Sequence, residues 1–311
     1  MFDLAVRKVT TVNAPSTIEH IQGTNLLKIS ATLPEAKAQR YVARPGSHVY
    51  MNIPSTARVS SSPIQKYVFD FLYNPFTVAS IDEEQNQITL VARSGTGPMT
   101  THLAHFASLG RQRVSSSTRP ASVQLGIEGP YGAVGKHYQD LLESGSHRIL
   151  IVAGGVGATF ALPLHRVISR DSPSAQIQLI WVVRSAGDAE WALTAGPDGE
   201  SIVDGSQVQL FVTGSTVEGE SGGIQAEELS DASAVEMSDV TAVHGSGVVT
   251  KSGQRPDLGK MVDDAFKVGL EEKVAILVCG PAVMAREIRA RIRPWVMKGR
   301  EVWWHNESFG W

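Results

Sequence analysis

The sequence predicts two successive domains: an antiparallel β-domain, either a barrel or a sandwich, followed by an α/β domain with a parallel sheet. The chain has 311 residues, a length that fits about two domains of average size. In its first part, short segments of alternating apolar and polar residues are separated by turn residues. Beyond about residue 145, apolar strands alternate with helical segments, as in a parallel sheet that is covered on both faces.

The first domain is expected to contain mostly strands, because β-branched and aromatic residues dominate its periodic segments. The expected strands are 26–34, 48–55, 67–80, 86–94 and a last one that runs from 123 into a Gly/Pro turn ending at 135. Residues 99–110 form the one expected helix, with Gly110 as its C-cap. Residues 111–122 are expected to form a polar loop.

The second domain begins with the apolar strand HRILIVA at 147–153. Further strands are expected at 175–185, 206–214, 272–280 and 301–309, and helices at 158–170, 257–270 and 281–296, the last with Pro281 in its first turn. Residues 214–250 contain seven acidic residues and no Lys or Arg. We expect them to form a disordered acidic insertion, with a docking segment as the alternative.

Composition excludes several classes of protein. The net charge of −3 argues against nucleic acid as the main partner, which would favour a basic face. The single cysteine cannot form a disulfide within the chain. The most apolar run, 149–164, is shorter than a membrane-spanning helix, and the first residues do not resemble a signal peptide, so we expect a soluble chain.

A glycine-rich segment, AGGVGATF at 153–160, follows one expected strand and opens an expected helix. The unpaired N–H groups of a helix N-terminus favour a bound phosphate, which predicts a nucleotide site at this turn. Gly155 and Gly157 match the first two glycines of the dinucleotide fingerprint G-x-G-x-x-G, but Phe160 takes the third position. The alternative is a tight turn that binds nothing.

The next expected strand ends with Arg184, in WVVRS. Sites that prefer NAD place Asp or Glu near this position to bind the ribose 2′-hydroxyl, whereas a guanidinium suits the 2′-phosphate of NADP. Arg184 therefore favours NADP, with a surface arginine as the alternative. Arg255, in GQRPDL, is a second and weaker candidate.

Three more segments place suitable groups at strand ends. In VCGP, Cys279 lies at the sheet edge where parallel α/β domains bind ligands, and small neighbours leave room for a flat ring. NPFTVAS at 74–80 offers an aromatic face and hydroxyls to a heterocycle. Arg93 and the helix start at Met99–Thr100 form a second anion-binding geometry, which suggests two nucleotides. Core packing is the alternative for Cys279 and for 74–80.

No metal or hydrolytic site is expected. His102 and His105 lie at i and i+3 on the expected helix, but no cysteine or acidic cluster completes a set of metal ligands. We therefore expect both histidines at the surface.

Seven motifs occur in a characteristic order: RPGSHVYMNIP, NPFTVAS, MTTHL, EGPYG, GGVGAT, VCGP and ESFGW. In this order they resemble the C-terminal dehydrogenase region of fungal ferric reductases and the related NADPH oxidases, in the ferredoxin–NADP reductase superfamily. The resemblance runs from about Arg44 to Trp311.

The resemblance implies an FAD-binding β-barrel over 1–140 and a Rossmann-like NADPH-binding α/β domain over 145–311, with the acidic insertion at about 214–250. For FAD it implies flavin contacts from Asn74, Pro75, Phe76 and Thr77, with Thr77 near N5, and pyrophosphate contacts from Arg93, Met99 and Thr100. For NADPH it implies phosphate contacts from Gly154, Gly155, Gly157, Ala158 and Thr159, with Arg184, joined by Arg255, at the 2′-phosphate. Cys279, Gly280 and Pro281 would flank the nicotinamide, and Trp311, or else Phe309, would cover the flavin face. The expected catalytic residues are Thr77, Cys279 and Trp311.

Three departures from the family pattern stand out. Asn74 occupies a position where the family usually has His, and Pro98 one where it usually has Gly. Family members also carry a bundle of membrane helices with two haems before the barrel, and this sequence does not include one. We therefore expect the dehydrogenase half of a longer product, a truncated gene model or a free-standing soluble reductase.

We therefore expect a flavoprotein that moves a hydride from NADPH to FAD and then single electrons to an acceptor, as the dehydrogenase half of a ferric-chelate reductase involved in iron transport. A haem-containing membrane domain or partner would place it at the cytosolic side of a membrane; otherwise it would be cytoplasmic. Two alternatives stay open: a regulatory or inactive nucleotide-binding module, and a soluble NADH-dependent enzyme of the cytochrome b5 reductase kind.

Overall fold

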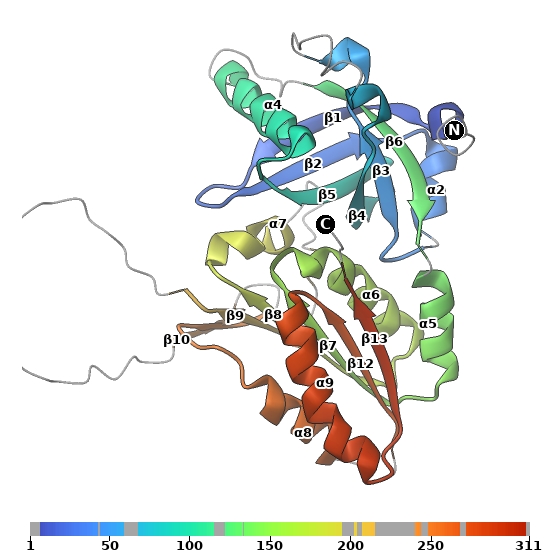
Figure 1. Cartoon of the computed structure of the whole chain (residues 1–311), viewed down its shortest axis with the longest axis vertical. Coiled ribbons are helices and arrows are strands. Elements are labelled where there is room, and N and C mark those ends of the chain that lie inside the picture. The colour runs from blue at the N-terminus through green and yellow to red at the C-terminus, as the bar shows by residue number, and fades with distance from the viewer. Residues whose placement is uncertain are drawn as a thin grey trace, which may run out of the picture.

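In the computed structural model, an N-terminal barrel packs on a C-terminal α/β domain (Figure 1). This confirms the expected fold class and selects the barrel over the sandwich. The structure describes residues 7–42, 44–58, 68–114, 122–132, 134–194, 202–203, 207–214, 240–243, 248–267 and 272–308.

The barrel closes because alternate residues of each strand point into one apolar interior. Leu27, Ile29 and Ala31 of one strand are fully buried, and the residues between them are partly exposed. The antiparallel strands follow the order β1–β2–β5–β4–β3–β6, with bounds β1 (Val12–His20), β2 (Leu26–Thr32), β3 (His48–Asn52), β4 (Asn74–Asp82), β5 (Gln87–Arg93) and β6 (Val123–Tyr131).

Several elements of the barrel domain differ from expectation. The strand β1, the helix α2 (Glu35–Val42) and the short 3₁₀ turn η1 (Ser55–Ala57) were not predicted. The expected strand 67–80 is helical at 68–71, and its extended part is β4. The helix α4 (Pro98–Val114) continues through Gly110, so the prediction of a C-cap there was wrong. Gly110 lies instead where α4 packs on β1, and a Cβ on it would be 3.8 Å from the carbonyl oxygen of Ile18.

The second domain is a seven-stranded sheet in the order β10–β11–β9–β8–β7–β12–β13, parallel except for the edge strand β10. Its strands are β7 (Arg148–Gly154), β8 (Gln176–Val183), β9 (Val208–Val212), β10 (Val240–Val243), β11 (Val249–Ser252), β12 (Val274–Cys279) and β13 (Val302–Glu307). Its helices are α5 (Val134–Glu143), α6 (Ala158–Asp171), α7 (Glu190–Leu193), α8 (Leu258–Lys267) and α9 (Ala282–Met297), with 3₁₀ turns η2 (Gly155–Gly157) and η3 (Ala186–Ala189).

Both faces of this sheet are covered, as the continuous apolar strands predicted. Ile149 and Ile151 of β7 lie in the cluster that contains α6, whereas Leu150 and Val152 lie in the cluster that contains α8 and α9 (Figure 1). Among the helices in the described part of the chain, none combines the length and apolar character that a membrane crossing requires.

Three expectations for this domain are corrected. The helix α5 was not predicted, and Pro281 is the N-cap of α9 rather than part of its first turn. The disordered insertion expected at 214–250 is too long, because β10 and the start of β11 lie inside that range and extend the sheet. Residues 215–239 and 244–247 lie outside the described residues.

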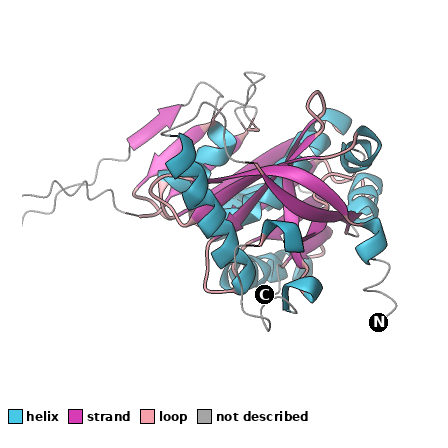
Figure 2. Cartoon of the chain, turned by 90° about the horizontal axis from the view of Figure 1, so that it is seen from above, coloured by secondary structure: helices cyan, strands magenta, loops and turns pink. Residues whose placement is uncertain are grey.

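The two domains share part of one apolar core. Ile21, Leu26, Ala79 and Val91 belong to the barrel, yet they pack in the same cluster as the buried side chains of α6. Seen from the barrel side, the strands lie at the centre of the molecule with helices around them (Figure 2). The barrel therefore rests directly on the helix that follows the glycine-rich turn.

Candidate active site

The glycine-rich turn connects β7 to α6 through η2. Gly155 has φ +55°, a left-handed backbone conformation that residues other than glycine rarely adopt. Its carbonyl oxygen accepts a hydrogen bond from the indole Nε1 of Trp181 at 2.9 Å. The hydroxyl of Thr159 donates to the carbonyl of Val156 at 2.8 Å, which fixes the start of α6.

The VCGP segment packs directly on this turn. A Cβ on Gly157 would overlap the backbone of Cys279, lying 2.8 Å from its carbonyl carbon, and one on Gly154 would lie 2.7 Å from Cδ of Pro281. A Cβ on Gly280 would likewise lie 3.1 Å from the amide nitrogen of Gly154. The structure thus brings two predicted motifs together, and their glycines are needed for mutual packing of the two turns.

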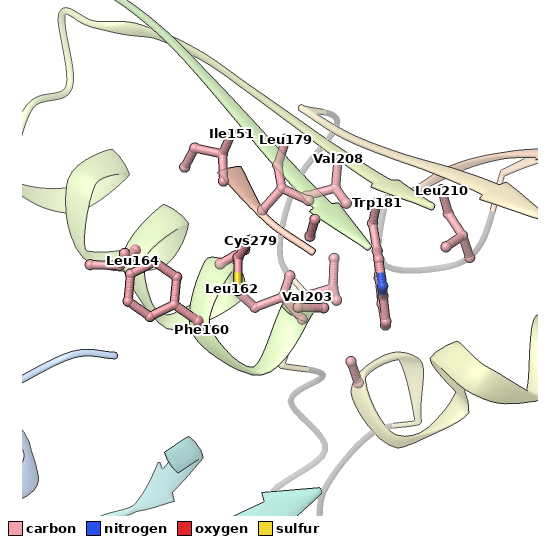
Figure 3. Close-up of a cluster of buried hydrophobic side chains, with 14 of the residues drawn as sticks. Ile151, Phe160, Leu162, Leu164, Leu179, Trp181, Val203, Val208, Leu210 and Cys279 are labelled. Carbon is pink, nitrogen blue, oxygen red and sulfur yellow. The ribbon is translucent and has the colours of Figure 1, made fainter. Parts of the chain in front are cut away.

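Cys279 is buried at the end of β12, and Figure 3 shows its sulfur among the apolar side chains beside α6. Burial raises the pKa of its thiol, and the negative charge of Glu307 adds to this shift. The thiol therefore stays protonated. It can serve as a small polarizable neighbour to a ring, but not as a nucleophile.

On the barrel side, the predicted flavin segment is the first half of β4. Thr77 is 8% exposed and pairs in register with His48 of β3, while Asn74 pairs with Met51. Pro75 and Phe76 are partly buried between them. A mostly buried hydroxyl next to a partly covered aromatic ring suits a flat polar heterocycle.

Arg93 ends β5 and crosses the boundary between the domains. Its Nη2 lies 3.5 Å from where a Cβ on Gly155 would be, so its exposed guanidinium covers the glycine turn of the other domain. The start of α4 lies just beyond it in the chain, where the hydroxyl of Thr100 bonds within the preceding loop at 3.2 Å from the carbonyls of Gly95 and Gly97. Met99 is 1% exposed and belongs to the barrel core, so its side chain cannot contact a surface ligand.

The two candidate cations for a 2′-phosphate are exposed at the carboxyl edge of the sheet. Arg184 follows β8, and Arg255 lies shortly after β11; β9 separates these strands. The ends of β8 and β11 are therefore two strand spacings, roughly 10 Å, apart. The amide of Gly214 donates to the carbonyl of Arg184 at 2.8 Å and fixes its backbone.

Two residues at this junction, Glu307 and His48, were not predicted from the sequence. Glu307 pairs in register with Cys279, and its Oε2 lies 3.0 Å from Nε2 of His305. Burial lowers the pKa of His48, the charge of Glu307 counters that shift and Arg7 strengthens it. Both residues stand inside motifs that carried the resemblance, RPGSHVYMNIP and ESFGW, but nothing local in the sequence indicates that they converge.

Two predicted residues, Phe309 and Trp311, lie outside the described residues. A separate cavity of about 820 Å³ lies between the β4–β5 turn, the loop after α2 and the outer part of α6. Arg44, Asp82 and Arg170 are among its lining residues, but none of the predicted nucleotide-binding residues is. The cavity is therefore distinct from the junction described above.

Comparison with known families assigns both halves of the chain. Residues 11–135 match the model of an FAD-binding domain, and residues 146–292 match that of the ferric reductase NAD binding domain. Together the two models span most of the chain, as an FAD-binding domain followed by a ferric reductase NAD binding domain. The expected resemblance is thereby confirmed.

Curated ferric reductase relatives are considerably longer than this chain. The ferric/cupric reductase transmembrane component 2 of Schizosaccharomyces pombe is 23% identical over 289 residues, covering 85% of this chain and 48% of the relative. The probable metalloreductase AIM14 of Saccharomyces cerevisiae is 26% identical over 204 residues, covering 61% of this chain and 31% of the relative. The chain spans about half or less of the length of these relatives.

Among solved structures, full-length CYP116B46 from Tepidiphilus thermophilus matches 97% of this chain and 29% of its own, with a TM-score of 0.53 and 16% identity. At that identity the likeness shows the fold alone. A barrel followed by a parallel α/β domain is therefore an arrangement already present among solved structures.

The junction of this ferric reductase domain fits the two nucleotides of the family. The left-handed Gly155 and the N-terminus of α6 form a cradle for a pyrophosphate, which Arg93 flanks with a positive charge. The start of β4 lies on the barrel side, and Cys279 on the sheet side. The matched family models imply FAD and a nicotinamide nucleotide as cofactors, and these residues have the chemistry to hold them.

Replacing Gly157 by Ala should disrupt the junction, because the new Cβ meets the rigid backbone of Cys279. We expect a loss of stability of about 1–3 kcal/mol, as for other overpacked sites, together with weaker nucleotide binding. Thermal melting and calorimetric titration with NADP⁺ measure the two effects. Gly110→Ala is the matched control. Gly110 lies within α4, and a Cβ there would make an ordinary contact with the carbonyl of Ile18, so stability should stay equal or rise. Equal losses in both variants would contradict this account.

The thiol of Cys279 should be unreactive in the folded protein, because burial keeps it protonated. With Ellman's reagent at pH 8, we expect slow reaction of the native protein and one thiol per chain after denaturation in guanidinium. Rapid reaction of the native protein would show that the residue is accessible. Bound NADP⁺ should slow the native reaction further if the nicotinamide covers this residue.

Proposed function

We propose that this chain is the NADPH-oxidising, FAD-containing half of a ferric-chelate reductase. The observation that supports it is the junction itself, where β4 packs on α6 through Ala79 and the glycine turn packs on the Cys279 segment. A flavin held by the barrel and a nicotinamide held by the sheet would meet there. When bound, NADPH supplies a hydride to FAD, and the reduced flavin supplies single electrons to an acceptor.

In this proposal, the residues of the chain bind and orient the two rings. Pro75, Phe76 and Thr77 would hold the flavin ring, and the Thr77 hydroxyl would be the hydrogen-bonding partner of its N5. Cys279 stays protonated beside the nicotinamide, where a small thiol lets the ring approach. Gly280 and Pro281 close the same side, and their packing on Gly154 keeps that wall fixed.

NADPH, rather than NADH, is proposed as the substrate because of the cations at the sheet edge. Arg184 directly follows β8, where NAD-binding domains use a carboxylate, and Arg255 follows β11, two strands away in the sheet. Arg93 and the start of α4 would take the pyrophosphate of FAD, while Gly154 to Thr159 would take that of NADPH.

The aromatic cover of the flavin is proposed from the family resemblance. In the ESFGW segment, Trp311 would stack on the flavin face where the nicotinamide must bind, with Phe309 as the second choice. The proposal requires this ring to move aside before hydride transfer.

The electron acceptor is proposed from the relatives' names. A transmembrane ferric/cupric reductase component is similar to 85% of this chain, which suggests a haem-containing membrane domain or partner that carries electrons to Fe(III). In this proposal, the domain would lie at the cytosolic side of a membrane.

The proposed function predicts a yellow protein whose flavin is reduced by NADPH. Under anaerobic conditions, NADPH should bleach the flavin absorbance near 450 nm completely, and faster than NADH does. FAD is added first, because Asn74 replaces the family's usual His beside the flavin. A protein that binds no FAD, or whose flavin ignores both nucleotides, would refute the proposal. Faster reduction by NADH would place the chain among NADH-dependent reductases.

Replacing Arg184 by Ala should weaken NADP⁺ selectively. Loss of a charge-assisted contact costs roughly 1.5–3 kcal/mol, or about tenfold to a hundredfold in the dissociation constant. Calorimetric titration with NADP⁺ and NAD⁺ tests this, with NAD⁺ affinity expected to stay unchanged. Arg289→Ala is the control, because Arg289 is exposed on α9 and should leave both affinities unchanged. An equal loss for both nucleotides would place Arg184 elsewhere.

A further inference from the structure

Trp181 connects the core of the α/β domain to the glycine turn. Its side chain is fully buried, at 0% exposure, and its indole Nε1 donates to the carbonyl of Gly155 at 2.9 Å. Figure 3 shows the indole nitrogen on the ring that extends from β8. An indole N–H in an apolar core needs an acceptor, and here the acceptor is a backbone carbonyl of the turn.

The carbonyl of Gly155 accepts this indole bond and a second bond from the amide of Ala158, and together the two bonds set which way the turn's N–H groups point. A peptide unit is planar and trans, so the carbonyl of Gly155 and the amide of Val156 point in opposite directions. When the carbonyl is held toward the buried indole, the amide of Val156 is directed away from the core. Without the indole donor, the bond from the amide of Ala158 remains, but a glycine that reaches left-handed φ easily holds this peptide less firmly.

A second indole acts in the same way on the neighbouring segment. The ring of Trp191 packs edge-on against Trp181, with centroids 5.7 Å apart, and its Nε1 donates to the carbonyl of Asp188 at 3.0 Å. The carboxylate of Asp188 in turn accepts a bond from the amide of Ser185 at 3.3 Å. These bonds hold the backbone immediately after Arg184.

We propose that the two indoles are positioning residues with separate targets. Trp181 sets the turn for the pyrophosphate that both nicotinamide nucleotides contain, and Trp191 sets the segment of Arg184 for the 2′-phosphate that only NADP carries. The inference rests on the proposed function, since it assumes that the turn binds a nicotinamide nucleotide. Two indoles that merely fill the core would have no such division of effect.

The test replaces each indole by Phe, which keeps a buried ring and removes the N–H donor. Each full-length variant, loaded with FAD, is titrated calorimetrically with NADP⁺ and with NAD⁺, and its thermal midpoint is recorded. Loss of one buried neutral hydrogen bond corresponds to roughly a fivefold change in affinity. We expect Trp181→Phe to weaken both nucleotides by that factor, and Trp191→Phe to weaken NADP⁺ alone.

The two variants are each other's control, because both lose an indole bond to a backbone carbonyl in one core. General destabilisation would lower the thermal midpoint and would change the affinities for NADP⁺ and NAD⁺ to the same extent. The same pattern of loss in both variants, or unchanged affinities in Trp181→Phe, would overturn the inference while leaving the proposed function intact. A wild-type protein that binds neither nucleotide would overturn both.

If Trp181→Phe does not fold, the wild-type protein carries the test. With ¹⁵N-labelled indoles, the N–H resonance of Trp181 should shift on addition of either nucleotide, because an anion at the amide of Val156 polarises the peptide that accepts its bond. The resonance of Trp191 should shift more with NADP⁺ than with NAD⁺. A Trp181 resonance that stays unchanged at saturating nucleotide would overturn the inference.

Discussion

The junction depends on the contact between two backbone turns at the carboxyl edge of the parallel sheet. Adjacent strands β7 and β12 end side by side, about 4.8 Å apart, and each continues into a turn and a helix. At that spacing there is no room for side chains between the turns, so Gly154, Gly157 and Gly280 are required. The contact fixes both the start of α6 and the wall formed by Cys279.

Much of the fold follows from patterns that depend on local sequence. The apolar strands HRILIVA and EKVAILVCG correspond to β7 and β12, and the alternating segments correspond to barrel strands, because burial dictates these periodicities. Gly110 was misassigned as a C-cap because α4 continues beyond it to Val114, which the local sequence does not reveal. The edge strands β10 and β11 were missed because they flank a polar acidic segment that resembles a linker throughout.

The sequence identified two segments that meet at the junction, but not the contacts by which they meet. The glycine turn and the VCGP segment were both predicted as ligand contacts. In the structure their glycines are needed for packing, because Gly154 lies against Pro281 and Gly157 against the backbone of Cys279. Met99 was chosen for its place at a helix start, but its side chain belongs to the barrel core. Trp181 and Glu307 act on residues far away in the chain, and no spacing or motif in one sequence signals such pairs.

The guanidinium of Arg93 has a consequence for how such enzymes can diverge. It belongs to the barrel, yet it lies over Gly155 of the other domain, while Ala79 and Val91 of the barrel fill the same core as α6. The two halves are therefore not interchangeable modules. A chimera that joined this barrel to the α/β domain of a distant homologue would need matching residues on both sides of this contact. Substitutions at the contact should therefore arise in compensating pairs over evolutionary time.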